Sequence, residues 1–524
     1  MKKNSIIGTI THWRDFKLQV FSEGIIVGIL TGIIAVLYRI LLYHADIGRK
    51  KIYSLLKEKS FFYIVGWFLL LIVVGIILGK IVKKYPMIKG SGIPQVKGVL
   101  VRKLKMEWLK ELITKFLGGV LALGFGLSLG REGPSVQLGS QVGMGVSSLF
   151  KRHNIEEKYL ITSGASAGLA AAFNAPLAGV MFSLEELHKN ISPIVLTCVM
   201  GASLVADFIS SVALGLKPIF NFEVVSVFPL NKYAYLVILG ILAGVVGKFF
   251  NTGLLKVQDY YSRQNLFKEE YKPIIPLVIS GFLGFFLPQA LGGGHNLIVH
   301  LSKVNMAIGV IILLLVVKFL FTIVCYGSGV PGGIFLPLLA IGALLGEGFG
   351  YICVNYFDID SIYTINIIIL SMAAFFTAVV RAPITGSILI TEMTGTFDHL
   401  LGLITVSITA YIVTDLLGSK PIYDALLEKL LKNNKNSDFS SDDEDEKTLM
   451  EIPVAMGSKI ENKYIKDIDW PSDCLLVGIK RGEWEMIPKG DTMILQGDSL
   501  IILSHKRQAD NLKYDLLLMG QESI

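Results

Sequence analysis

Long apolar runs alternate with short hydrophilic stretches along the sequence from about residue 24 to residue 417. A transmembrane helix needs about 20 apolar residues in succession, and several of the runs are shorter or are interrupted by glycine and proline. We therefore predict a mixture of spanning and partly spanning helices. The approximate runs are 24–43, 61–79, 116–130, 159–188, 194–216, 233–251, 273–292, 307–325, 333–353, 363–380 and 400–417.

Two glycine-rich segments lie directly between apolar runs. They are G-R-E-G-P at 130–134 and G-V-P-G-G-I-F-L-P at 329–337. Irregular backbone at membrane depth is tolerated only where protein or an aqueous cavity satisfies its polar groups. Both segments are therefore predicted to form parts of a binding site.

The apolar region contains an internal repeat. Segment 173–186 resembles segment 380–393, and the segment that starts at Lys115 resembles the one that starts at Lys318. A weaker similarity joins GSGIP at 90–94 to GGGHN, and all three similarities occur in one order at nearly one separation. Paired glycine- and proline-interrupted segments in two halves are a sequence signature of a transporter site near the bilayer midplane.

Composition excludes a soluble multidomain chain. Hydrophobic residues make up 52% and charged residues 17%, whereas soluble proteins carry about 25% charge. The net charge of +7 does not indicate nucleic-acid binding, because the basic residues cluster in stretches that flank apolar runs, as the positive-inside rule predicts. These stretches are Arg49–Lys51, Lys83–Lys84 and Lys97–Lys105.

The hydrophilic ends predict four segments. Residues 1–20 are polar and are expected to form a cytosolic N-terminal segment, and residues 21–431 are expected to form the membrane domain. Residues 432–447 read as an acidic linker, because they are rich in like charge and nearly free of apolar residues. Residues 448–524 are predicted to form a small α+β domain, since CLLVGIKRG and SLIILSH are typical of strands.

The glycine-rich segments predict an anion site. Glycine lets backbone N–H groups approach a ligand, and a helix start adds partial positive charge. GREGP at 130–134, GGIFLP at 332–337 and GSGIP at 90–94 all suit this geometry, and Ser91 adds a hydroxyl donor. Close helix packing through small residues explains any one motif equally well, but three together favour a permeating anion.

Carboxylates near that site are the next candidates for function. Glu132 would compete with the anion when charged and leave the site when protonated, which would couple anion and proton movement. Glu185 and Glu186 point about 100° apart on a helix, so one of them is expected to face a pathway. The alternative, that one or both pair with a buried cation or cap a helix, stays open.

An intramembrane enzyme is not expected. The apolar spans contain no nucleophile–base pair and no cluster of metal ligands in their sequence, and no cofactor is predicted. The bound species that the motifs predict are transported ions.

Taken together, the motifs resemble the CLC family of chloride channels and chloride/proton antiporters over about residues 20–431. The resemblance rests on GSGIP, GREGP, AAFNAPLAGVMFSLEE, GGIFLP and the tyrosine of GSKPIYDALL. It implies an all-α polytopic membrane fold, an inverted repeat of tilted and broken helices. It also implies a homodimer in the lipid bilayer of the cell membrane, with one pore in each subunit.

The resemblance also assigns chloride donors. Ser91 and Tyr423 match the hydroxyl donors to a central chloride, and the backbone amides of Ile334 and Phe335 match its main-chain donors. Arg131 and Gly133 match the loop around an outer chloride site, and these two flank the glutamate discussed next.

Proton coupling is assigned to two glutamates. Glu132 matches the external gating glutamate, and Glu186 matches the internal proton-transfer glutamate that antiporters carry. Glu186 therefore favours chloride/proton antiport, and the alternative is a passive voltage- or ligand-gated chloride channel. Nitrate-selective members have proline in place of Ser91, and fluoride exporters depart from the GSGIP and GREGP motifs, so chloride is the expected anion.

Residues 480–503 resemble the RCK_C (TrkA-C) subdomain of potassium-transport regulators. The resemblance implies a cytoplasmic regulatory domain that dimerises and binds a cyclic dinucleotide, with cyclic di-AMP as the first candidate. Ile487 and Pro488 are the expected interface contacts, and Arg481 is the expected phosphate partner. A dimerisation domain without a ligand is the alternative.

Overall fold

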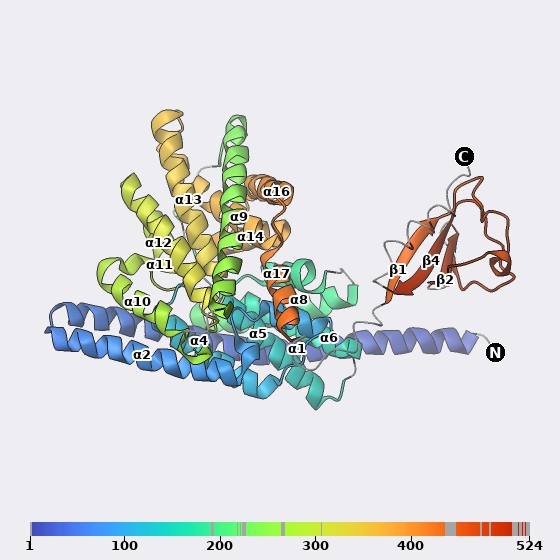
Figure 1. Ribbon diagram of the computed structural model, residues 1–524, viewed down its shortest axis with the longest axis horizontal. Coiled ribbons are helices and arrows are strands. Elements are labelled where there is room, and N and C mark those ends of the chain that lie inside the picture. The colour runs from blue at the N-terminus through green and yellow to red at the C-terminus, as the bar shows by residue number, and fades with distance from the viewer. Residues whose placement is uncertain are drawn as a thin grey trace. The chain divides into compact units, whose positions relative to one another are not determined.

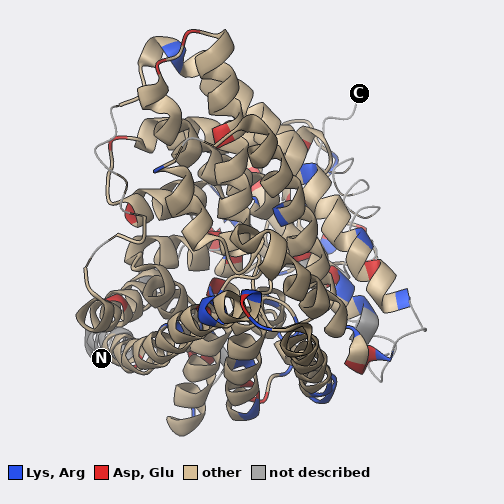
Figure 2. Cartoon of the chain, turned by 90° about the vertical axis from the view of Figure 1, so that its left-hand side faces the viewer, with Lys and Arg blue, Asp and Glu red and all other residues tan. Residues whose placement is uncertain are grey.

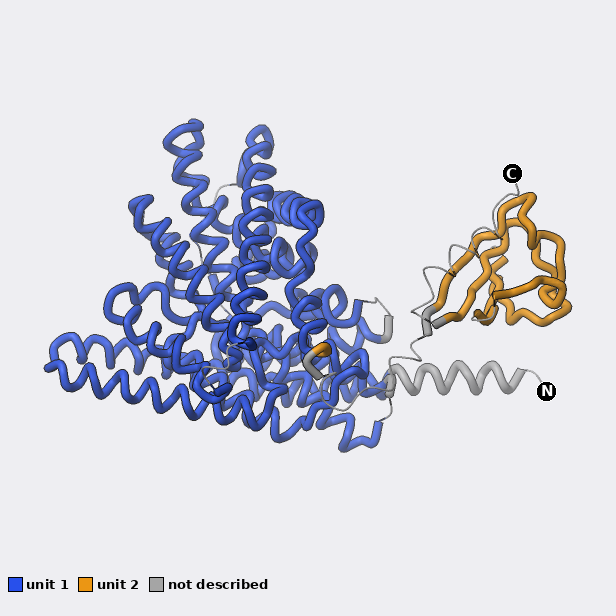
Figure 3. Tube along the Cα trace, in the orientation of Figure 1, with its two compact units in different colours: residues 1–430 blue, residues 431–524 orange. Residues whose placement is uncertain are grey.

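The computed structural model divides the chain into two compact units, Met1–Leu430 and Leu431–Ile524 (Figure 3). Most of the predicted acidic linker, at positions 435–446, lies outside the described residues. The structure describes residues 3–152, 154–189, 193–216, 218–220, 222, 227–263, 268–304, 306–434, 447–471, 474–481, 484–505, 512, 516 and 519.

Helices joined by short turns make up the described part of the first unit (Figure 1). Its first half contains α1 (Lys3–Lys57), α2 (Phe61–Lys84), α3 (Ile93–Leu100), α4 (Trp108–Gly124), α5 (Glu132–Leu149), α6 (Asn154–Phe173), α7 (Pro176–Phe182) and α8 (Pro193–Leu214). Its second half contains α9 (Tyr233–Arg263), α10 (Ile274–Phe286), α11 (His295–Leu301), α12 (Ile308–Gly327), α13 (Phe335–Tyr356), α14 (Thr364–Val380), α15 (Pro383–Thr394) and α16 (Leu400–Leu416). A last helix, α17 (Ile422–Asn434), follows.

The outer faces of these helices suit lipid. Among the described residues, seven helices are long and apolar enough to cross a membrane. Large apolar side chains such as Phe62 and Phe286 are more than 80% exposed, and most of the helix length carries neither acidic nor basic residues (Figure 2). Exposing such an apolar surface to water is unfavourable, whereas contact with the hydrocarbon core of a bilayer is not. The predicted polytopic helical membrane fold is confirmed.

Proline divides the predicted apolar run 159–188 into two helices. Helix α6 ends at Phe173, and α7 begins at Pro176 and continues as a π-helical turn over Ser183–His188. Proline is favoured at the first helical position because its missing N–H would have no partner there. Helix α15 begins in the same way at Pro383. The length of the run alone would suggest a single span, but the run forms two helices.

The two halves share one packing scheme. Helix α5 packs on α6 as α13 packs on α14, and α1 packs on α8 as α9 packs on α16. The two short proline-led helices α7 and α15 contact each other. Helices α1 and α5 to α8 thus have counterparts in α9 and α13 to α16, which is the structural form of the repeat seen in the sequence.

Reciprocal carboxylate caps connect the two short helices. The carboxylate of Glu185 accepts hydrogen bonds from the backbone N–H of Ile384 (3.3 Å) and Thr385 (2.8 Å) at the start of α15. Its counterpart Glu392 accepts from the N–H groups of Leu177 (3.0 Å) and Ala178 (2.7 Å) at the start of α7. A carboxylate at a helix start satisfies orphan donors and opposes the positive end of the dipole.

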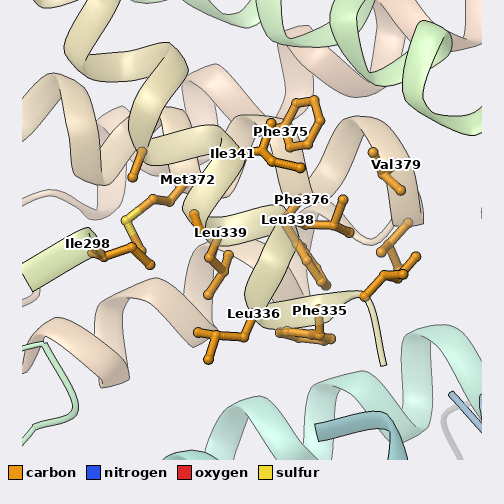
Figure 4. Packing of buried hydrophobic residues seen from close by; sticks show 14 of the residues in the cluster. Ile298, Phe335, Leu336, Leu338, Leu339, Ile341, Met372, Phe375, Phe376 and Val379 are labelled. Carbon is orange, nitrogen blue, oxygen red and sulfur yellow. The ribbon is translucent and has the colours of Figure 1, made fainter. Parts of the chain in front are cut away.

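Buried apolar side chains fill the space between α13 and α14. Figure 4 shows Phe335 and Phe376 in contact, with ring centroids 4.4 Å apart. The same Phe335 ring packs against Phe173 of α6 at 5.2 Å. The start of α13 is therefore held by aromatic packing from both halves of the unit.

The second unit contains a four-stranded antiparallel sheet in the order β1-β4-β2-β3. Alternating side chains, such as Leu500 and Ile502, are buried in its core. Strands β2 and β4 confirm the two predicted strands, and β1 and β3 were not predicted. The strands are β1 (Lys447–Pro453), β2 (Cys474–Arg481), β3 (Trp484–Met486) and β4 (Asp498–His505).

The reciprocal caps generate a stability prediction. Glu185→Gln and Glu392→Gln are each expected to cost about 1–2 kcal/mol, because a neutral amide loses the charge-assisted bonds to the two N–H groups. Thermal unfolding of the detergent-solubilised protein measures the loss. Glu428→Gln is the control, since Glu428 pairs with Lys420 on the surface and exposed pairs contribute little. Equal midpoints for all three variants would contradict the role of the caps.

Candidate functional site

The three glycine-rich segments meet through their backbones. Gly130 and Gly333 exchange two N–H···O bonds of 2.7 and 2.8 Å, and the N–H of Gly332 donates to the carbonyl oxygen of Gly90 at 2.9 Å. The starts of α3, α5 and α13 follow these contacts directly. The structure therefore brings together the three segments that the sequence predicted to form one anion site.

Glycine is required where these segments touch. A Cβ atom on Gly133 would lie 2.8 Å from the Cβ of Ser91, which is closer than two carbon atoms can approach. Gly92 has a φ of 88°, a left-handed conformation that other residues rarely adopt. Both positions explain why the motifs tolerate no larger residue at these points.

Two buried lysines hold the turns before the helix starts. The Nζ of Lys115 donates to the carbonyl oxygens of Ile88 (2.9 Å) and Gly90 (2.7 Å). In the second half, the Nζ of Lys318 donates in the same way to the carbonyl oxygens of Ala290 (3.0 Å) and Gly292 (2.5 Å). The sequence showed these lysines as part of the repeat, but it did not reveal what they bind.

Glu132 is the first residue of α5 and its side chain is fully buried. Among the described residues, neither carboxylate oxygen has a hydrogen-bond partner. The backbone amide of Leu336, in the first turn of α13, faces the carboxylate without meeting hydrogen-bond geometry. The carboxylate thus lies between two helix starts, where negative charge is favoured.

Arg131 borders this carboxylate but does not pair with it. Its Nη2 donates to the carbonyl oxygen of Ala172 at 3.2 Å, and its Nε has no partner among the described residues. The guanidinium is therefore positioned by backbone, with donor capacity left beside Glu132.

The amides of Ile334 and Phe335 stand at the start of α13. Both residues are fully buried, and the carbonyl oxygen of Ile334 accepts the first helical bond from Leu338 at 2.9 Å. The first N–H groups of an α-helix have no partner within the helix. These two amides therefore stand at the junction of the three segments, and their role as chloride donors stays a prediction.

Two hydroxyl groups were predicted beside them. The Oγ of Ser91 accepts from the N–H of Ile93 at 3.3 Å and lies 3.4 Å from the hydroxyl oxygen of Tyr326. The Tyr423 side chain is fully buried, and its hydroxyl has no partner within the described residues. Tyr326 lies near Tyr423 and was not predicted, since it stands inside an apolar run without a motif of its own.

Glu186 occupies a different place from Glu132. Its Oε1 accepts from the Nζ of Lys97 at 2.7 Å, and both side chains are buried. Glu185, its neighbour, caps α15 instead. The sequence left open that these glutamates pair with a buried cation or cap a helix. Glu186 forms such an ion pair, and Glu185 caps a helix. The interpretation of Lys97 as part of a basic stretch flanking a span is wrong, because the side chain is buried in an ion pair.

In the second unit, Arg481 is engaged by its own sheet. Its Nε and Nη2 donate to the carboxylate of Asp498 at 2.7 and 2.8 Å, and Nη2 also donates to the carbonyl oxygen of Met493. Burial of Asp498 acts to raise the pKa of its carboxyl group, but the hydrogen bonds that it accepts, from Arg481 above all, hold that pKa below its usual value. Phosphate binding by Arg481 stays a prediction, and this pairing weighs against it. Ile487, which the sequence predicted as an interface contact, is 87% exposed.

Relatives and solved structures resemble the chain over most of its length. The H(+)/Cl(-) exchange transporter ClcA of Vibrio cholerae serotype O1 is 38% identical over 356 residues, which is 67% of this chain and 76% of the relative. The protein of the same name from Salmonella arizonae is 32% identical over 440 residues, 82% of this chain and 93% of the relative.

Solved structures share the fold of the membrane unit. A slow cyanobacterial Cl-/H+ antiporter superposes with a TM-score of 0.75 at 32% identity, covering 79% of this chain and 99% of that chain. A CLC-type fluoride/proton antiporter gives a TM-score of 0.65 at 24% identity, covering 78% of this chain and 97% of that chain. The second likeness supports the fold only.

Two family descriptions match the chain. Residues 449–513, which include most of β1 and all of β2, β3 and β4, match the TrkA-C domain. Residues 74–415 match the family described as voltage gated chloride channel, and this match includes the junction of the glycine-rich segments and both candidate glutamates. Because that match spans more than half of the chain, the chain belongs to the voltage-gated chloride channel family.

Proposed function

We propose that this protein is a secondary active antiporter that exchanges chloride for protons across the cell membrane. The observation that carries the proposal is the buried carboxylate of Glu132, which has no hydrogen-bond partner among the described residues and lies at the junction of the helix starts. Relatives named H(+)/Cl(-) exchange transporter support the same activity.

Chloride is proposed to bind at the start of α13. The amides of Ile334 and Phe335, with the hydroxyl groups of Ser91 and Tyr423, are donors of the kind that a dehydrated anion requires. The Tyr423 hydroxyl is buried without a partner within the described residues, and such a group favours a ligand that accepts its hydrogen bond. Arg131 and Gly133 are proposed to border an outer chloride position.

Glu132 is proposed to act as the gate. When ionised, its carboxylate competes with chloride for the positive ends of α5 and α13. When protonated, it loses that attraction and leaves the site to chloride. Each cycle of gate movement thus exchanges a proton for anions, and Glu186 is proposed to deliver protons from the opposite side.

We further propose that the protein is a homodimer with one pore in each subunit and that the TrkA-C domain is cytoplasmic. A two-fold axis gives the domain a self-complementary surface, and the exposed Ile487 with Pro488 suits it, because large exposed apolar side chains mark interfaces. Cyclic di-AMP, which has two-fold symmetry, is the proposed regulatory ligand at that surface.

Reconstitution of the purified protein into liposomes tests the exchange. A chloride gradient is expected to drive uphill proton movement in the wild type. In Glu132→Gln, chloride flux is expected to continue while proton movement is lost, because the amide neither carries a proton nor competes as an anion. Chloride flux without proton movement in the wild type would show a passive channel. Proton pumping by the variant at the wild-type ratio would exclude Glu132 as the gate.

The paired glutamates give a second prediction. Glu186→Gln is expected to reduce proton transport at least tenfold while chloride binding is largely retained, since this residue is proposed to transfer the proton. Glu185→Gln is the matched control and is expected to keep the wild-type ratio of protons to chloride, because its carboxylate caps α15. Flux measurements in the same liposomes decide, and the reverse order of effects would overturn the assignment.

Ligand binding by the TrkA-C domain is testable by calorimetry. Cyclic di-AMP titrated into the full-length protein in detergent is expected to bind with one ligand for two chains, because a symmetric ligand occupies a two-fold axis. A chain that ends at residue 434 lacks the domain and is expected to give no heat. If the full-length protein also gives no heat at high micromolar ligand, the domain has a dimerisation role only.

A further inference from the structure

Glu186 belongs to a cluster of four charged side chains, together with Lys97, Asp424 and Lys189. Lys97 donates from its Nζ both to Glu186, at 2.7 Å, and to the Oδ1 of Asp424. The second carboxylate oxygen of Asp424 accepts from the Nζ of Lys189 at 2.8 Å. One ammonium group is thus shared between two carboxylates, and a second ammonium group holds the outer carboxylate.

Exposure increases along this cluster. The side chains of Glu186 and Lys97 are about as buried as the protein core, at 5% and 6% exposure. Asp424 is 28% exposed and Lys189 is 55% exposed. The cluster therefore leads from the buried Glu186 to the exposed Lys189.

The backbone connects this cluster to the anion donors. Lys97 lies on α3, the helix that starts two residues after Ser91. Asp424 follows Tyr423 directly in the first turn of α17. The two proposed hydroxyl donors therefore lie next to residues of the cluster in the chain: Ser91 precedes the helix that carries Lys97, and Tyr423 adjoins Asp424.

Few other ionisable groups face Glu186. Helix α7 carries no ionisable residue, and α3 carries only Lys97. Helix α6 presents Tyr159 and Lys158 to His188 rather than to Glu186. Helix α17 adds Tyr423, which is buried nearby. Among the described residues, the electrostatic environment of Glu186 is consequently set mainly by Lys97, Asp424 and Lys189.

The charges in this cluster balance. When both carboxylates are ionised, Lys97 and Lys189 compensate them. When Glu186 takes up a proton, Lys97 keeps Asp424 as its partner, so no buried ammonium group is left unpaired. Without Asp424, the same protonation would leave Lys97 buried without a counter-charge, which is strongly unfavourable.

We propose that Lys97 and Asp424 are positioning residues that set the pH at which Glu186 exchanges its proton. Lys97 favours the ionised form of Glu186, and Asp424 offsets that effect by sharing the cation. The inference rests on the proposed antiport and deepens it, because it names the groups that tune the internal proton site.

Opposite shifts in pH dependence test this arrangement. In Lys97→Met, Glu186 loses its cation, so the midpoint of chloride-driven proton flux is expected to move to higher pH by about 1–3 units. In Asp424→Asn, Lys97 acts on Glu186 alone, so the midpoint is expected to move to lower pH. Proton flux is measured in liposomes at equal pH on both sides under a fixed chloride gradient, and chloride flux in the same samples reports folded protein.

Two variants serve as matched controls. Lys97→Arg keeps the cation and is expected to keep the wild-type midpoint within about half a unit of pH. Glu428→Gln removes an acidic residue one turn further along α17, where it pairs with Lys420 on the surface, and is expected to change nothing. Midpoints that do not move in Lys97→Met and Asp424→Asn, or that move in the same direction, would overturn the proposal.

The outcome separates this inference from the antiport itself. If Glu186→Gln retains proton transport, the proposed role of Glu186 fails. If Glu186→Gln abolishes proton transport but the midpoints of the other variants stay unchanged, only the role of Lys97 and Asp424 fails. Should Lys97→Met not fold, Asp424→Asn decides alone, because its carboxylate is partly exposed and its removal leaves no cavity.

Discussion

The need to solvate an anion without water constrains the rest of the membrane unit. A buried anion requires donors that are already fixed, and helix starts supply them without adding full positive charge. Here the starts of α3, α5 and α13 are held together by the backbone bonds between Gly130 and Gly333 and between Gly332 and Gly90. Lys115 and Lys318 donate hydrogen bonds to carbonyl groups of the turns before α3 and α11, so their charge stabilises these turns and not the proposed anion directly.

The two duplicated halves share one arrangement of helices but differ in the functional side chains that these helices carry. Lysines at equivalent positions hold equivalent turns, and Glu185 and Glu392 cap each other's short helix. At the start of α5 the scaffold carries Glu132, whereas at the start of α13 it carries Phe335, whose ring packs into the core. The residue that follows the cap is Glu186 in one half and Met393 in the other. The two halves therefore share the caps and differ in the carboxylates that follow them in the chain.

The sequence predicted what depends on local pattern. Proline and glycine marked the broken helices, and the short run of β-forming residues in SLIILSH marked β4, because each of these signals is contained in a few neighbouring residues. The contacts of Lys97 could not be predicted in this way, since Asp424 is far away in the chain and a lysine near an apolar run resembles the end of a span. Strand β3, with three residues, is too short to show a period, and β1 adjoins the acidic stretch.

Helix α17 connects the transport site to the second unit. It begins with Ile422, carries Tyr423 and Asp424 in its first turn, and ends at Asn434, beyond the boundary between the units. Lys429 on the same helix pairs with Asp259 of α9 at 2.6 Å, so the helix is also anchored to the second half of the membrane unit. An effect transmitted along the chain from the TrkA-C domain would therefore reach the proposed anion donor Tyr423 and the carboxylate of Asp424 on one helix. Such an effect would change chloride binding and proton exchange together, because a shift of α17 moves both side chains.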